Sequence, residues 1–126
     1  MLGSSAVLTM PQYIPPERYS TRPTRRLNHH QREDIYALGF ILWELSSGRV
    51  PWENHDSMTI MRKVCDGGRE DAVAGMPVEY VKLYQKCWAQ DPNERPSASE
   101  VLESLISMPL ESVVVKFRPF RIVNSC

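Results

Sequence analysis

The fold is decided by the stretch Asp34-Ile35-Tyr36-Ala37-Leu38-Gly39-Phe40-Ile41-Leu42-Trp43-Glu44-Leu45, which closes with Ser46-Ser47-Gly48. A helix drawn through this stretch carries apolar side chains on nearly every face, and Asp34 stands where an N-cap residue would stand. A helix that is apolar all round belongs inside a protein, covered by other elements. The sequence therefore predicts one central buried helix that begins at Asp34 and ends before Gly48.

Three further segments show the periodicity of one-faced helices. The first lies between Asp56-Ser57 and the Gly67-Gly68 stop, and its apolar positions are Met58, Met61, Val64 and Cys65. The second begins at Pro77 and ends before Asp91-Pro92, and its apolar positions are Tyr80, Val81, Tyr84, Cys87 and Trp88. The third follows the capping box Ser97-Ala98-Ser99-Glu100, and its apolar stripe is Ala98, Val101, Leu102, Leu105 and Ile106. With no convincing strand pairing beside them, these helices predict an all-α fold.

Charge and composition exclude several classes of partner. The 126 residues include 15 basic and 15 acidic side chains, so the formal net charge is zero. Nucleic acids and anionic membrane surfaces attract proteins with an excess of Lys and Arg, which this chain lacks. No apolar run approaches the roughly 20 residues of a membrane-spanning helix, and the first residues lack the basic start of a secretory signal. We therefore expect a cytoplasmic protein that binds neither nucleic acid nor membrane.

The two ends of the chain are expected to be irregular. Pro11, Pro15, Pro16 and Pro23 crowd the N-terminal stretch and predict a loop. Residues 108–126 carry β-branched and aromatic side chains around Pro119, so any strand there would be an edge strand.

Three motifs occur in a definite order along the chain. They are Tyr13-Ile14-Pro15-Pro16-Glu17, then Asp34-Ile35-Tyr36-Ala37-Leu38-Gly39, then Cys87-Trp88-Ala89-Gln90-Asp91-Pro92-Asn93-Glu94-Arg95-Pro96-Ser97. In this order they resemble the C-terminal half of a eukaryotic protein-kinase catalytic domain. The first is similar to the Ala-Pro-Glu element that closes the activation segment, with Pro15 in place of Ala. The other two are similar to the start of the central helix of the large lobe and to the arginine region before its last helix.

The resemblance covers about residues 9–107 and divides the chain. It implies the C-terminal portion of a kinase domain over residues 1–107, with the end of the activation segment at 1–17 and a helical subdomain at 18–107. Residues 108–126 form a tail outside the match. Trp88 with Arg95-Pro96-Ser97 points to the tyrosine-kinase-like branch, and Pro11-Gln12-Tyr13 before Ile14 favours serine/threonine specificity within it.

The resemblance implies structural roles for six residues: Pro16, Glu17, Asp34, Gly39, Trp88 and Arg95. Glu17 and Arg95, each of which could by itself be a surface charge, would form a buried bidentate pair that joins the activation segment to the loop before the last helix. Asp34 would cap the central helix and also accept backbone N–H groups of a catalytic loop. Gly39 would permit the close approach of a neighbouring backbone, and Trp88 would belong to the core.

The peptide-facing loop of the family corresponds to Thr9, Met10 and Pro11. Thr9-Met10 aligns with the usual Gly-Thr pair of that loop, so the threonine that contacts the catalytic aspartate is displaced or absent.

The residues that transfer phosphate in the family have no counterpart in these 126 residues. Kinases use a glycine-rich loop, a strand lysine, an His-Arg-Asp loop and an Asp-Phe-Gly aspartate. Here Gly67-Gly68 follows a helix, and Asp34 follows Glu33 instead of His-Arg. We therefore assign no catalytic, cofactor-binding or metal residue, and ATP and magnesium enter only as cofactors of the family.

Two functions remain open. The chain is a partial serine/threonine kinase domain that is inactive alone, or a pseudokinase remnant that acts as a helical protein-interaction module. Its central helix presents more apolar surface than three short helices can cover. Both functions therefore predict a protein partner, the missing kinase half, or self-association.

Overall fold

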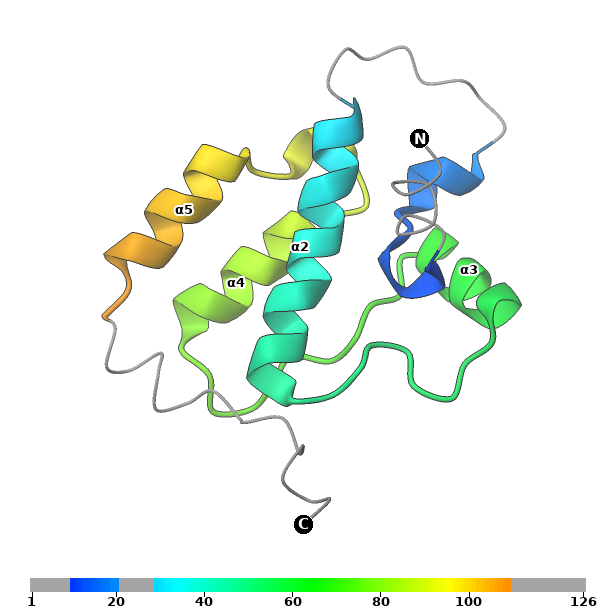
Figure 1. The fold of residues 1–126 in the computed structure, drawn as a ribbon, viewed down its shortest axis with the longest axis horizontal. Coiled ribbons are helices and arrows are strands. Elements are labelled where there is room, and N and C mark those ends of the chain that lie inside the picture. The colour runs from blue at the N-terminus through cyan, green and yellow to red at the C-terminus, as the bar shows by residue number, and fades with distance from the viewer. Residues whose placement is uncertain (1–9, 21–28, 110–126) are drawn as a thin grey trace.

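The computed structural model describes residues 10–20 and 29–109 (Figure 1). Two short 3₁₀ turns, η1 (Pro11–Tyr13) and η2 (Pro16–Tyr19), precede the long helix α2 (His29–Ser47). The elements α3 (Ser57–Cys65), α4 (Val78–Cys87), η3 (Pro92–Glu94) and α5 (Ala98–Ser107) follow. Within the described ranges there is no strand, so the expected all-α fold is confirmed.

Helix α2 lies at the centre of the molecule. In Figure 1, α4 and α5 lie on one side of it, and α3 with the two N-terminal turns lies on the other. Its buried face contributes Ile35, Tyr36, Phe40, Leu42 and Trp43 to a single core, which is completed by Trp52, Ile60, Val64, Met76, Tyr80, Leu83, Tyr84, Cys87, Trp88 and Val101. None of the helices in the described part is both long and apolar enough to cross a bilayer.

Helix α2 begins at His29, so the predicted start at Asp34 is wrong. Asp34 lies inside the helix with an exposed side chain, and it therefore cannot serve as the N-cap. The preceding turn is held by polar contacts that an apolar pattern does not record. The Arg32 guanidinium donates to the carbonyl of Pro92 at 3.0 Å, and the buried carboxylate of Glu33 accepts from Arg18 at 3.0 Å.

The predicted inner face of α3 is also wrong in part. The helix begins as expected, because the Asp56 carboxylate accepts the backbone N–H of Thr59 at 2.8 Å. Its buried residues are Ile60 and Val64, whereas Met58 and Cys65 are exposed. The difference arises because α3 packs against η1 and η2, and the sequence pattern of α3 alone does not say from which side these turns approach.

Helix α5 confirms the predicted capping box but not the whole predicted stripe. The Ser97 hydroxyl accepts from the Glu100 N–H at 3.1 Å, and the Glu100 carboxylate accepts from the Ser97 N–H at 2.8 Å. Of the stripe, only Val101 is buried, while Leu102 and Ile106 are 57% and 72% exposed. The helix meets the rest of the protein on a narrow face along α4.

Candidate functional site

The Arg95 guanidinium is the centre of the polar site. Its Nη1 and Nη2 atoms donate to the two carboxylate oxygens of Glu17 at 2.8 and 2.9 Å, and no part of the Arg95 side chain is exposed. Its Nε donates to the carbonyl of Ala89 at 2.9 Å, and Nη1 also donates to the carbonyl of Arg32 at 3.0 Å. The predicted pair therefore exists, and one guanidinium joins η2, α2 and the segment after α4.

A second ion pair fixes the same turn to the central helix. Arg18, next to Glu17 in η2, donates through Nε to the Glu33 carboxylate, whose side chain is only 4% exposed. Together the two pairs hold successive residues of η2 against different elements. Because the buried Pro16 also packs there, the path of this turn is fixed at three consecutive positions.

Tyr36 lies beneath two guanidinium groups. The Cζ atoms of Arg95 and Arg69 lie 5.0 and 5.2 Å from the centre of its ring, within the range of cation–π attraction. Burial raises the pKa of the Tyr36 hydroxyl, although both guanidinium charges act in the opposite direction. Arg69 makes its hydrogen bonds to carbonyl groups, among them that of Trp88 at 2.9 Å and that of Gly68 at 2.7 Å. Arg69 therefore ties the end of α3 to the end of α4 across the ring.

Just after the predicted peptide-facing loop, a side-chain hydrogen bond attaches the chain to α2. The Tyr13 hydroxyl, at the end of η1, donates to the Glu44 carboxylate, and burial together with this carboxylate raises the pKa of Tyr13. Of the loop residues named from the sequence, Met10 is exposed and Pro11 is half-buried, while Thr9 lies outside the described residues.

Asp34 and Gly39 lie on different faces of α2. Asp34 lines a cleft of about 550 Å³ between the start of α2, η3 and the start of α5. At Gly39, an added Cβ would lie 2.9 Å from the Cβ of Cys87 and 3.0 Å from the carbonyl oxygen of Tyr84. The predicted close approach at Gly39 is confirmed, and it lets α4 cross α2 with little space between them.

The aromatic side chains serve the core, as the sequence predicts. Trp43, Trp52 and Trp88 are buried, and the Trp88 ring lies 4.5 Å from Phe40 and 5.0 Å from Tyr84 between centroids. Across the described residues, no group of three or more His, Cys, Asp or Glu side chains is placed to hold a metal ion.

The family profile described as "Protein tyrosine and serine/threonine kinase" matches residues 4–105. The chain belongs to this protein kinase family. The matched range includes η1, η2, the central helix α2 and the segment around η3.

Several curated relatives are similar to much of this chain. A probable LIM domain-containing serine/threonine-protein kinase of Dictyostelium discoideum is 39% identical over 83 residues, which are 66% of this chain and 8% of the relative. The dual specificity protein kinase pyk3 of the same organism is 32% identical over 102 residues, which are 80% of this chain and 7% of the relative. A putative serine/threonine-protein kinase/receptor of Acanthamoeba polyphaga mimivirus is 28% identical over 98 residues, which are 78% of this chain and 5% of the relative. The chain thus spans only a small part of the length of these kinases.

Sequence analysis missed the polar residues that surround the predicted pair. Arg18, Arg32, Arg69 and Glu33 all act through contacts between distant segments. The sequence contains one indication that Glu33 is buried. It lies three residues before Tyr36 and seven before Phe40, which places it on the same helix face as these two aromatic residues. A charge on an apolar face predicts a buried ion pair.

Proposed function

We propose that this chain forms the helical part of the large lobe of a serine/threonine protein kinase. Phosphorylation of proteins would require it to act together with the segments that bind ATP and magnesium. The observation that carries the proposal is the Glu17–Arg95 pair, which is buried and bidentate and joins two family motifs 78 positions apart. A pair of this geometry holds the end of the activation segment in one place, and positioning accounts for most of the catalysis in this reaction.

The two N-terminal turns would present the protein substrate. Tyr13 is attached to Glu44 and η2 is attached at Glu17 and Arg18, so the backbone between them has little freedom. The exposed Met10 leads into this rigid segment. We infer that the acceptor peptide would lie along this edge, where its hydroxyl group could meet a catalytic aspartate supplied by the missing segments.

Asp34 would hold the catalytic loop. Its carboxylate is exposed and lines the cleft beside η3, so it can accept backbone N–H groups from a segment that enters there. In this proposal Asp34 positions another loop and touches no reacting atom.

The first test is ligand binding by the purified chain. We expect ATP with magnesium to leave its thermal unfolding midpoint unchanged and the chain to phosphorylate no generic protein substrate, because no residue here is assigned to bind nucleotide. A ligand that binds only the folded state raises the midpoint. A magnesium-dependent shift with ATP would therefore contradict the proposal that this chain is catalytically incomplete.

The alternative, a pseudokinase remnant that serves as an interaction module, rests on an exposed apolar face of α2. The outer face of α2 carries Ile41 and Leu45, which are 44% and 39% exposed, beside the half-buried Leu38. This apolar stripe would bind a protein under either hypothesis. The two are distinguished by transplanting residues 10–107 into an active kinase, because only a large-lobe scaffold would then support phosphorylation.

A further inference from the structure

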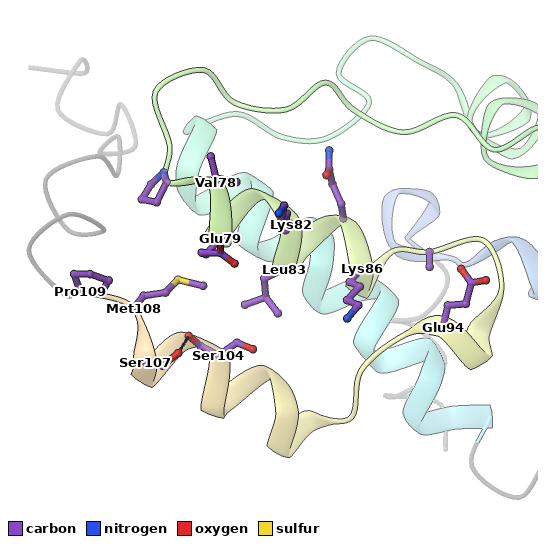
Figure 2. A pocket seen from close by; sticks show the side chains of 13 residues that line it. Val78, Glu79, Lys82, Leu83, Lys86, Glu94, Ser104, Ser107, Met108 and Pro109 are labelled. Atoms are coloured by element: carbon purple, nitrogen blue, oxygen red, sulfur yellow. Dashed lines mark hydrogen bonds between the residues drawn. The ribbon is translucent and has the colours of Figure 1, made fainter.

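A groove lies between α4 and α5, away from the polar site, and its volume is about 930 Å³. Figure 2 shows α4 along one side of it, with Val78, Lys82 and Lys86 in this order, and Ser104 and Ser107 of α5 along the other side. The groove is therefore open to solvent between two helices that contribute different side chains to its walls.

The α4 wall of the groove changes character along its length. It begins with Val78, which is 63% exposed, and with the acidic Glu79. Lys82 and Lys86 follow one helical turn apart, both exposed, and among the described residues neither forms an ion pair. Leu83 is buried at the base. This wall fits an occupant that has an apolar surface at one end and a carboxylate farther along.

The outer face of α5 has this composition. Leu102 and Ile106 are 57% and 72% exposed, lie four residues apart, and do not line the groove. Glu103 is exposed too and lies three residues before Ile106, so helical geometry places the three side chains on one side of α5. Within the described residues Glu103 forms no ion pair. One chain thus carries both a groove with free lysines and a helix face with a free carboxylate.

The spacings of these two surfaces agree along the helix axis. A helix rises about 1.5 Å per residue, so Lys82 lies about 6 Å from Val78 along α4. Glu103 lies about 4.5 Å from Ile106 along α5. If α5 of a second copy runs antiparallel to α4 with its Ile106 at Val78, its Glu103 comes nearly level with Lys82. In the opposite direction Glu103 would lie beyond the start of α4, away from both lysines.

The direction of the resident α5 agrees with this arrangement. Figure 2 shows Val78, at the start of α4, at the same end of the groove as Met108, which follows the end of α5. The resident α5 is therefore antiparallel to α4, and a second α5 in the groove would be parallel to it, as in a row of similarly oriented copies. The contact uses two different surfaces, so further copies can add at both ends.

We propose that the groove between α4 and α5 binds the outer face of α5 of a second copy of this chain. Ile106 of the second copy covers Val78, and its Glu103 lies against Lys82 and Lys86. The start of the second α5 then points toward Glu94, which lies beyond Lys86 (Figure 2), and a helix N-terminus attracts a carboxylate. This inference does not depend on the kinase function proposed above, because it uses only the outer surfaces of α4 and α5.

Chemical cross-linking between labelled chains tests the contact and its occupant. A carbodiimide joins a carboxylate to an amine without a spacer, so it couples Glu103 to Lys82 or Lys86 only where they touch. In an equimolar mixture of ¹⁴N- and ¹⁵N-labelled chains, the coupled peptide should contain both isotopes as often as one, and Glu103→Gln should abolish it. A coupled peptide found only within one isotope would place Glu103 against its own chain and overturn the proposal, as would the absence of this peptide.

Complementation between two surface variants tests the head-to-tail arrangement. Val78→Glu alters only the groove and Ile106→Glu alters only the outer face of α5, and both positions are exposed. Each variant alone should give roughly a tenth of the parental yield of coupled peptide, the equivalent of about 1.4 kcal/mol in the association equilibrium. An equimolar mixture of the two should recover the peptide, with its Glu103 supplied by the Val78→Glu chain, because only that chain retains the α5 face.

The matched control is Met58→Glu, which places the same charge at a position that is 64% exposed on α3. It should leave the yield of coupled peptide unchanged. A mixture that yields no more than either variant alone, or an equal loss with Met58→Glu, would overturn the proposal.

Discussion

Arg95 and Glu17, 78 positions apart in sequence, meet through two parallel hydrogen bonds of 2.8 and 2.9 Å around a guanidinium group that has no exposed surface. The same guanidinium donates to the carbonyls of Ala89 and Arg32, so its four hydrogen bonds join three segments of the chain. Removal of either partner would leave a charge enclosed without compensation.

We expect Arg95→Ala to lower the free energy of unfolding by about 3 to 5 kcal/mol, the usual cost of removing one partner from a buried pair. The matched control is Arg49→Ala, because Arg49 contacts Glu53 at 3.4 Å and both side chains are largely exposed. That variant should cost at most about 1 kcal/mol. Urea unfolding of the two variants gives the comparison, and equal midpoints would mean that the Glu17–Arg95 pair adds nothing to stability.

Gly39→Ala should destabilise the protein, although glycine-to-alanine changes in helix interiors ordinarily stabilise by about 1 kcal/mol. The added Cβ would meet the Cβ of Cys87 at 2.9 Å and the Tyr84 carbonyl at 3.0 Å, and backbone cannot move away cheaply. We expect a net loss of about 1 to 3 kcal/mol in chemical denaturation, the range for overpacked interiors. An increase in stability would show that α2 and α4 are farther apart than described.

Stability should fall as the pH rises above 9 because of Cys87. Burial raises the pKa of this thiol to about 12, against an opposing effect of the Arg95 charge. Between about pH 9 and pH 12 the unfolded chain has lost the thiol proton and the folded chain retains it, so rising pH favours unfolding. The expected loss is about 1 to 2 kcal/mol between pH 8 and pH 10.

Cys87→Ala tests the origin of this slope. It should flatten the pH dependence between pH 8 and pH 10, whereas Cys65→Ala, at an exposed position, should leave it unchanged. Denaturation midpoints of the three proteins at several pH values provide the measurement. If Cys87→Ala retains the full slope, other groups cause the loss.

The outer face of α2 should govern self-association. Ile41→Glu with Leu45→Glu places two charges on the exposed stripe, and we expect a lower mass by light-scattering chromatography and weaker binding of a hydrophobic dye. Met58→Glu is the control, because Met58 is 64% exposed on α3 and lies outside the stripe. The expectation fails if the parent chain is already monomeric and binds no dye. It also fails if Met58→Glu has the same effect as the double variant.

Local signals predicted the helices and several of their ends. The capping box at Ser97 and the N-cap at Asp56 involve residues three positions apart, so the sequence displays both partners. The Glu17–Arg95 pair was predicted for another reason, because each residue lies within a motif of a known family. Both kinds of evidence apply to Gly39, because it is a glycine inside a helical pattern and it also lies within a motif of the family.

The orientation of the shorter helices could not be predicted in the same way. Ile60, not Met58, faces the core because η1 and η2 cover α3 from a direction that only the tertiary structure determines. The start of α2 was misplaced because Arg32 and Glu33 are held by distant partners, Pro92 and Arg18. Polar contacts between distant segments leave almost no trace in a hydrophobic pattern.

The measurement that tests the proposed function most directly is the phosphorylation rate of a chimeric kinase. Residues 10–107 would replace the corresponding segment of an active serine/threonine kinase, with and without Arg95→Ala. We predict a rate within roughly tenfold of the host's, that is within about 1.4 kcal/mol of its activation barrier, and loss of this rate in the Arg95→Ala chimera. A chimera that folds and binds ATP with magnesium but transfers no phosphate would contradict the account and favour an interaction module.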